Sequence, residues 1–360
     1  MKRRIDIVSL LIVFVCISCG KGNLDDGIRQ DGVLLDIKES ILSDETKAPI
    51  LPDSYGDSQT FPKGATYGLF ICDHHNGEGE NPYKEHAYLY NNICATKSNS
   101  GTAWMYNYSG STSTFPSLFL LGKKDESDES VHADIFAYAP YIRDVVSPEH
   151  IPFKVSDQAD MMYAVQNRTA GNKDIDPMGP ERTRPVYLTF VHTLALLEFN
   201  FEVKNELINH PEENKYANGY TLKKITISKT STADAPLYTT GELNAVTGEL
   251  VNLTEAESIA VSYSSYATNG QRKIKAHLLL VPTQPDDEEF VFSFVFDGVT
   301  LNTVFNLKKE HLRHGESDTY GFQAGYEYKF NFVIDNYIHF KDVEFGEWTT
   351  VEEPVYEIHI

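Results

Sequence analysis

The 360-residue sequence is poor in cysteine and tryptophan, with four Cys and two Trp, and it has few basic residues for its size. Lys and Arg number 31 against 52 Asp and Glu, which gives a formal charge of −21. Nucleic-acid binding needs a basic surface, so this balance argues against a nucleic-acid partner. Beyond the N-terminus there is also no apolar run of about 20 residues, the length that a membrane-spanning helix requires.

Catalytic signatures are missing as well. The chain has no GxSxG, no HExxH and no glycine-rich phosphate-binding loop. One segment gathers side chains that can bind metals: Cys72, Asp73, His74, His75, Glu78, Glu80 and His86. Their spacing matches no zinc motif, and Gly77 and Gly79 indicate a flexible turn, so we interpret the segment as a solvated loop. The sequence therefore predicts no enzymatic activity, no metal site and no cofactor.

Aromatic side chains are abundant, at 12% of the residues, with 21 Tyr and 20 Phe. This composition favours an all-β protein, because aromatic residues are enriched in strands. The clearest strand is Phe290–Phe296, in which every second residue is Phe. Asp297-Gly298 and a second alternating run, Val299–Leu307, follow it, and an Asp-Gly pair between such runs predicts a β-hairpin. Tyr326–Ile334 alternates in the same way.

The run Val186–Lys204 contains no Gly or Pro, and its apolar alternation changes phase near Leu196 and Leu197. Such a change indicates either one bulged strand within a single domain or a strand that leaves one core and enters another. We favour the second interpretation. It predicts two tandem domains, residues 60–190 and residues 191–360, each an antiparallel β-sandwich.

Other strand-like runs are separated by loops of Gly, Ser, Asn, Asp and Pro. In the first half they are Thr66–Ile71, His86–Tyr90, Ala103–Tyr108, Ala133–Ile142 and Met161–Val165. In the second half they are Leu197–Val203, Thr221–Ser228, Ile259–Tyr263 and Ile274–Val281. Leu278–Val281 is apolar on both faces, which predicts a central strand.

The N-terminus has the layout of a secretory signal, with basic residues at positions 2–4 before a short apolar run. Cys19 and its neighbours then resemble a bacterial lipobox, in which the Cys becomes the lipidated first residue. We predict a signal peptide at 1–18 and a lipid, such as palmitate, on Cys19; the alternative is an ordinary signal peptide cleaved elsewhere. Residues 19–59 predict a polar tether with one apolar patch, Val33–Ile37, that could form a strand.

Two features leave alternatives open. Cys72 and Cys94 form either one disulfide, as exported proteins allow, or two buried thiols. Trp104, Tyr106 and Tyr108 share one face of one strand. They belong either to a sandwich core, which we favour because alternating aromatics usually pack inward, or to an exposed platform. The platform would support an alternative function, that of a monomeric surface lipoprotein that binds glycans.

A series of motifs runs along nearly the whole chain. In order they are Cys19, Phe136-Ala137-Tyr138-Ala139-Pro140-Tyr141, Ser156-Asp157, Met161-Met162-Tyr163-Ala164, Phe190-Val191-His192-Thr193-Leu194-Ala195, Leu279-Leu280-Val281-Pro282, and Gly325–Phe332 followed by Trp348. The series resembles the fimbrillin (Mfa-like) family of lipoprotein pilins from Gram-negative anaerobes, and the order of the motifs is the specific part of the likeness.

The resemblance implies two transthyretin-like β-sandwich domains in a fimbrial subunit or fimbria-associated adhesin, exported as a lipoprotein to the outer membrane and cell surface. Its implied partners are other fimbrial subunits, the outer membrane through the lipid, and a ligand on a host or bacterial surface. Stalk, tip and anchor roles all stay open.

The resemblance also implies assembly by donor-strand exchange. In this family a protease removes an N-terminal segment after a basic residue, and a strand from the next subunit fills the groove. Arg29 is the candidate cleavage site here, with Lys38 and Lys47 as alternatives. The candidate donor strand is the C-terminal run Val355, Tyr356, Glu357, Ile358, His359 and Ile360.

Overall fold

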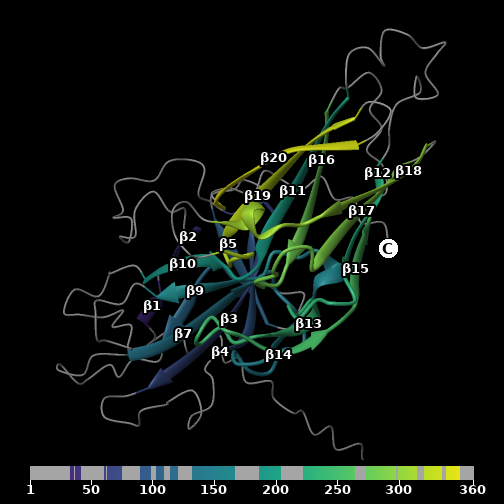
Figure 1. The fold of residues 1–360 in the computed structure, drawn as a ribbon. Helices are drawn as coiled ribbons and strands as arrows, with labels where there is room; N and C mark the ends of the chain where they lie inside the picture. The colour runs from purple at the N-terminus through teal and green to yellow at the C-terminus, as the bar shows by residue number, and fades with distance from the viewer. Residues whose placement is uncertain are drawn as a thin grey trace, which may run out of the picture.

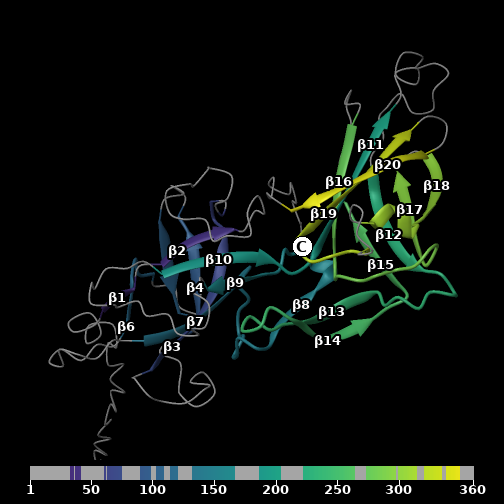
Figure 2. The same ribbon diagram turned by 60° about the vertical axis from the view of Figure 1, so that its left-hand side comes forward.

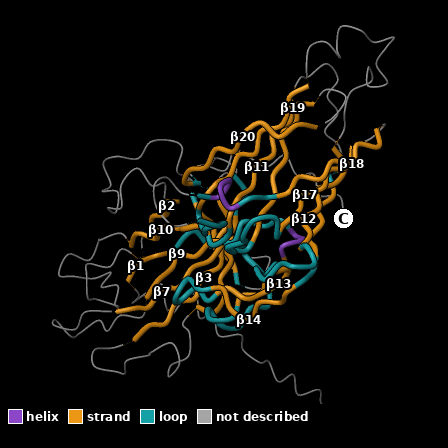
Figure 3. The backbone as a smooth tube through the Cα atoms, viewed as in Figure 1, coloured by secondary structure: helices purple, strands orange, loops and turns teal. Residues whose placement is uncertain are grey.

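The computed structural model describes residues 33–35, 37–41, 61, 63–74, 90–98, 103–108, 114–120, 132–166, 186–203, 222–263, 273–296, 299–313, 320–334 and 338–348. In these residues helical geometry is confined to two short 3-10 helices, η3 (Val155–Asp157) and η4 (Lys309–Leu312), and strands form the rest of the framework (Figures 1 and 3). The predicted all-β class is confirmed. No helix in this part of the chain is long and apolar enough to cross a membrane.

The first half of the chain forms a seven-stranded sheet. Its strands lie in the order β2 (Ile37–Ile41), β10 (Val186–His192), β9 (Met162–Gln166), β7 (His132–Ala139), β3 (Thr66–His74), β4 (Tyr90–Lys97) and β5 (Trp104–Asn107). Neighbouring strands are antiparallel except β2 and β10, which are parallel. A separate antiparallel pair joins β1 (Val33–Leu35) to β6 (Leu118–Leu120).

This sheet curls until its two ends meet. The ring centroids of Tyr67 on β3 and Phe190 on β10 are 5.4 Å apart, although β9 and β7 separate these strands in the sheet. The outermost strands also approach each other, because the Trp104 side chain on β5 acts on the Glu39 carboxyl group on β2. The rolled sheet and the β1–β6 pair therefore enclose the core of the first half together.

The second half contains two four-stranded sheets whose inner faces pack together (Figure 2). The first has the order β16 (Lys273–Leu280), β11 (Ala195–Val203), β19 (Tyr326–Ile334) and β20 (Ile338–Glu347). The second has the order β15 (Ser258–Ser262), β12 (Leu222–Lys229), β17 (Phe290–Phe296) and β18 (Val299–Asn306). Phenylalanine rings interlock between the sheets: the Phe294 ring lies 5.5 Å from Phe199 and 5.1 Å from Phe201.

Two strand predictions for this half have opposite outcomes. The hairpin predicted on either side of Asp297-Gly298 is confirmed by the antiparallel pairing of β17 with β18, while the turn residues lie outside the described part of the chain. The central strand predicted at Leu278–Val281 is wrong, because β16 is an edge strand. The segment after η3 covers the outer edge of this strand, where the main-chain N–H of Leu279 donates to Gln158 Oε1 at 2.8 Å.

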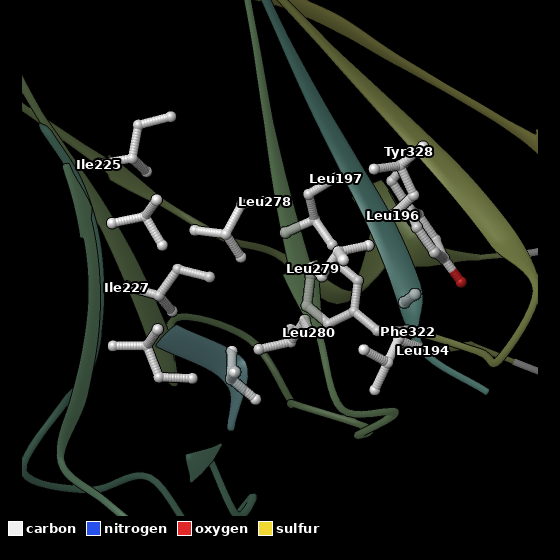
Figure 4. Packing of buried hydrophobic residues seen from close by; sticks show 14 of the residues in the cluster. Leu194, Leu196, Leu197, Ile225, Ile227, Leu278, Leu279, Leu280, Phe322 and Tyr328 are labelled. Atoms are coloured by element: carbon white, nitrogen blue, oxygen red, sulfur yellow. The ribbon is translucent and has the colours of Figure 1, made fainter. Parts of the chain in front are cut away.

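A three-stranded sheet draws on both halves of the sequence. Its order is β14 (Leu250–Glu255), β13 (Tyr238–Leu243) and β8 (Ile151–Lys154). The β8 residues Ile151 and Phe153 are buried in the same apolar cluster as the sandwich residues. Figure 4 shows part of this cluster, with Ile225 and Ile227 on one side and Leu197 and Tyr328 on the other. The apolar core is therefore continuous from β8 into the second half.

The chain passes from one core to the other between β10 and β11. Thr193 and Leu194 separate the two strands, which belong to different sheets. Phe190 lies in the smaller apolar cluster, inside the seven-stranded sheet, whereas Leu194 lies in the larger cluster of the second half, which also takes in Phe70, Phe136 and Tyr138 from the first half. The chain therefore leaves the first sheet at Thr193 and Leu194, slightly before the change in alternation that the sequence shows near Leu196. The division into two domains at this point stays a prediction.

Candidate strand-acceptor site

Strand β2 is a short outer strand, and it precedes all the other strands of its sheet in the sequence. It has five residues, and β10 is its strand neighbour in the seven-stranded order. The parallel register pairs Ile37 with Val186, Glu39 with Leu188 and Ile41 with Phe190. Because alternate side chains of a strand share a face, residues 37, 39 and 41 enter the core together. Ile37 and Ile41 are buried there.

Aromatic side chains pack together around β2 in this core. The Phe61 and Phe190 rings are 4.9 Å apart and nearly perpendicular, and the Tyr67 and Trp104 rings are 4.5 Å apart. Such edge-to-face pairs add to the stability that burial alone provides. We call Phe61, Tyr67, Trp104, Leu188 and Phe190 the β2 slot. Its walls come from strands at both ends of the sheet, so only the curled fold assembles it.

The centre of the β2 slot is polar. The Tyr67 hydroxyl donates to Glu39 Oε1 at 2.9 Å, and the Trp104 side chain also acts to lower the pKa of this carboxyl group. Lys97 favours the ionised carboxylate from a greater distance, while its Nζ donates to the main-chain oxygen of Phe61 at 2.6 Å. Burial raises the pKa of Glu39 to about 7, and these interactions offset only part of the effect. The Glu39 carboxyl group is thus partly protonated near neutral pH.

His192 lies where the two halves meet. His192, at the end of β10, hydrogen bonds through Nδ1 to Asp160 Oδ1 at 3.0 Å. Its ring stacks on Trp348 with the centroids 3.8 Å apart. His192 Nε2 and Trp348 Nε1 are buried without a hydrogen-bond partner among the described residues. Beside them an open pocket of about 390 Å³ is lined by Tyr163, His192 and Leu253, among others. The stack holds the end of β20 against the end of β10.

Several residues predicted as sites lie outside the described part of the chain. These are Cys19, Arg29, Lys47 and the run Val355–Ile360, together with His75, Glu78, Glu80 and His86 of the proposed solvated loop. Within the described ranges, no group of three His, Cys, Asp or Glu side chains is placed to hold a metal ion. Cys94 is a free, buried thiol, and burial raises its pKa.

The aromatic stripe on β5 belongs mainly to the core. Tyr106 is buried, and Trp104 packs against the Phe61 and Tyr67 rings. Tyr108 is 41% exposed and lies 5.3 Å from the Phe115 ring. The core interpretation is confirmed for Trp104 and Tyr106, and the stripe does not form an exposed platform.

The role of Glu39 was not predicted from the sequence. The apolar patch Val33–Ile37 indicated a strand, and the structure places β1 and the first residue of β2 there. The signal that could have located the slot is the alternation of Ile37, Glu39 and Ile41 in a segment treated as a polar tether.

The protein is thus all-β, and its strand β2 completes a sheet whose other strands all follow later in the sequence. A family model described as fimbrillin-like matches residues 59–350, and the chain belongs to this fimbrillin-like family. Strands β1 and β2 therefore precede the matched region. No curated protein matches the chain.

Two solved structures of similar fold come from Bacteroides species. A candidate cell adhesion protein from Bacteroides ovatus has a TM-score of 0.53 and 15% identity, covering 89% of this chain and 99% of that one. A second, from Bacteroides uniformis, has a TM-score of 0.51, 16% identity and the same coverage. The tip fimbrial protein Mfa3 from Porphyromonas gingivalis scores 0.37 at 11% identity, covering 79% of this chain and 95% of that one. The first two likenesses show the fold alone.

Proposed function

We propose that the protein is a fimbrial subunit or fimbria-associated adhesin that is exported as a lipoprotein through Cys19 and assembles by donor-strand exchange. In this proposal each half of the chain is a transthyretin-like β-sandwich domain, and the partners are other fimbrial subunits at the outer surface of the cell. Membership of the fimbrillin-like family supports the fimbrial role.

The position of β2 is the observation that supports assembly by donor-strand exchange. This strand precedes the family-matched region, yet its side chains Ile37 and Ile41 fill the core beside Leu188 and Phe190. Its removal would expose the apolar β2 slot and leave the main chain of β10 unpaired on that side. A sheet edge in this state recruits another strand, because backbone hydrogen bonds and alternate side chains both favour pairing.

The chain order refines the cleavage part of the proposal. A cut after Arg29 would leave both β1 and β2 joined to the rest of the chain. A cut after Lys47 would separate both strands from it. Cleavage that opens the slot must therefore fall after Ile41, and cleavage at Arg29 would require a further step to release β2.

The test is limited proteolysis of the full chain with an Arg-specific and, separately, a Lys-specific protease. Mass spectrometry locates each cut, and electrophoresis in SDS without boiling detects stable multimers. We expect multimers only when the cut lies after Ile41, with Arg29→Ala and Lys47→Ala variants as matched controls. Release of β2 without multimers at any concentration would contradict assembly through the slot.

A further inference from the structure

The open pocket beside His192 lies where segments of both halves meet. Tyr163, Val191 and His192 come from strands of the first sheet, while Leu250 and Leu253 come from β14. The volume of about 390 Å³ falls within the range of about 300–1,000 Å³ that is typical of small-molecule sites. The pocket is therefore large enough to hold a small molecule between the two halves.

The pocket wall is uncharged and mostly apolar. Among the described residues that form it there is no Asp, Glu, Lys or Arg, although these four types make up 23% of the chain. Thr193 is one of its few polar residues, and its hydroxyl already donates to the main-chain oxygen of Met161 at 2.7 Å. Because moving a charge out of water into such surroundings is costly, the wall favours an uncharged ligand.

His192 gives the pocket a hydrogen-bond acceptor. Its Nδ1 lies 3.0 Å from Asp160 Oδ1, and an ionised carboxylate can only accept, so Nδ1 carries the ring proton and donates it. In the neutral ring Nε2 is then an acceptor. The His192 side chain is only 2% exposed, and Nε2 is buried without a hydrogen-bond partner in the part of the chain that the structure describes. Asp160 does not line the pocket, so Nε2 is the ring nitrogen that a molecule in the pocket can reach.

Tyr163 gives the pocket a flat aromatic surface, and Gly248 makes room for it. Gly248 has a φ of +84°, and a Cβ atom there would lie 2.1 Å from Tyr163 Cζ. A residue with a side chain at position 248 would therefore displace the Tyr163 ring. An aromatic ring in this place suits a ligand with an apolar or aromatic body.

We propose that this pocket binds an uncharged molecule with an apolar body and one hydroxyl group, an alcohol or a phenol, whose hydroxyl group donates to His192 Nε2. Tyr163, Leu250 and Leu253 cover the apolar body. The site is independent of the strand exchange proposed above, because no residue of β2 or of the β2 slot lines it.

The experiment titrates the full chain with three probes that share one body, followed by isothermal titration calorimetry. They are 4-propylphenol, its methyl ether 4-propylanisole, which cannot donate, and the anion 4-propylbenzoate. We expect the phenol to bind, the ether to bind about tenfold more weakly because one hydrogen bond is lost, and the anion to show no binding. Equal binding of phenol and ether would overturn the role of His192 Nε2, and preferred binding of the anion would overturn the uncharged ligand class.

Variants at Ala324 place the probe in the pocket. Ala324 lies on the pocket wall and is exposed, so Ala324→Trp should fill the space and abolish binding of the phenol, while Ala324→Ser should leave it unchanged. His192→Phe should keep a ring there and remove the difference between phenol and ether, with circular dichroism confirming that this variant folds. Phenol binding that survives Ala324→Trp would show that the probe binds elsewhere and would overturn the site.

A partner protein is the competing occupant of the pocket. If none of the three probes binds, and Ala324→Trp abolishes self-association of the full chain in analytical ultracentrifugation, a side chain of a second copy fills the pocket and the small-molecule proposal is wrong. The proposal is equally wrong if no probe binds and self-association is unchanged. Binding of the phenol that is lost in Ala324→Trp, with self-association unaltered, supports it.

Discussion

The two halves of the molecule each bury a glutamate, and they treat it in opposite ways. Glu39 in the first half meets Tyr67 and Trp104, and burial raises its pKa to about 7. Glu198 in the second half accepts hydrogen bonds from Lys275 Nζ at 2.8 Å and His277 Nε2 at 3.1 Å. Burial alone would raise the pKa of Glu198, but hydrogen bonds from His277, Lys275 and Asn200 outweigh it and hold that pKa well below its usual range.

This difference follows from where the two glutamates lie. Glu198 is on β11, between β16 and β19, and the Lys275 ammonium group on β16 compensates its charge. Glu39 is on a short outer strand, and its neighbours are neutral donors. We therefore expect the second half to behave as a fixed body, and the docking of β2 in the first half to depend on the protonation of Glu39.

The largest expected effect is in the phenylalanine core of the second half. Phe294→Ala removes a fully buried ring that contacts Phe199, Phe201 and Phe332, and we expect a loss of about 4 kcal/mol in the free energy of unfolding. Urea denaturation followed by circular dichroism measures it. Val295→Ala on the opposite face of β17, where the side chain is 40% exposed, is the control and should cost under about 1 kcal/mol. Equal losses would contradict the assignment of inner and outer faces.

Replacing Glu198 tests how much its ion pair with Lys275 stabilises the second half. Glu198→Gln should lower stability at pH 7 by about 2 kcal/mol, since Lys275 and His277 lose their buried acceptor charge. The folded pKa lies below the ordinary 4.5, so this stabilisation is present above about pH 4.5 and is lost as the pH falls below it. The gap between variant and unchanged protein should therefore shrink in acid. The exposed Glu310→Gln serves as control, and a gap as large at pH 3 as at pH 7 would count against the ion pair.

Replacing Glu39 tests whether the docking of β2 depends on the protonation of this side chain. Its folded pKa of about 7 is above the ordinary 4.5, so docking of β2 is strongest below pH 4.5 and weakens as the pH rises toward 7. We expect a change of about 2 kcal/mol across this window, seen as faster hydrogen exchange in β2 and β10. Glu39→Gln should remove the pH dependence and keep the hydrogen bonds. A pH profile unchanged in this variant would show that another group is responsible.

The smallest expected effect comes from the hydroxyl that faces Glu39. Tyr67→Phe removes a hydrogen bond that lowers the pKa of Glu39, so the midpoint of the β2 transition should move to higher pH. The loss of stability should be about 1 kcal/mol. Hydrogen exchange across the same pH range measures both, with Tyr108→Phe at the exposed end of the stripe as control. A midpoint that moves to lower pH would contradict the direction of this hydrogen bond.

The strands that could be predicted are those whose pattern is local. Alternating aromatic residues identified β17 and β19, because a half-buried strand alternates at period two whatever it packs against. Strand β4 was placed poorly, since Asn92 interrupts its pattern. The structure buries that side chain, where it hydrogen bonds to Ile142 and Tyr138. Strand β20 was not predicted, because Lys341, Asp342 and Glu344 on an edge strand are only partly covered or exposed.

The sequence by itself determined the all-β class, the phenylalanine hairpin and the approximate place where the chain changes cores, because these depend on composition and on neighbouring residues. It did not determine the β2 slot. Glu39 in a polar segment is typical of a solvated residue, and its partners Tyr67 and Trp104 are remote in sequence. Only the curl of the sheet brings β2, β3 and β5 together, and burial there gives an ordinary glutamate an unusual pKa.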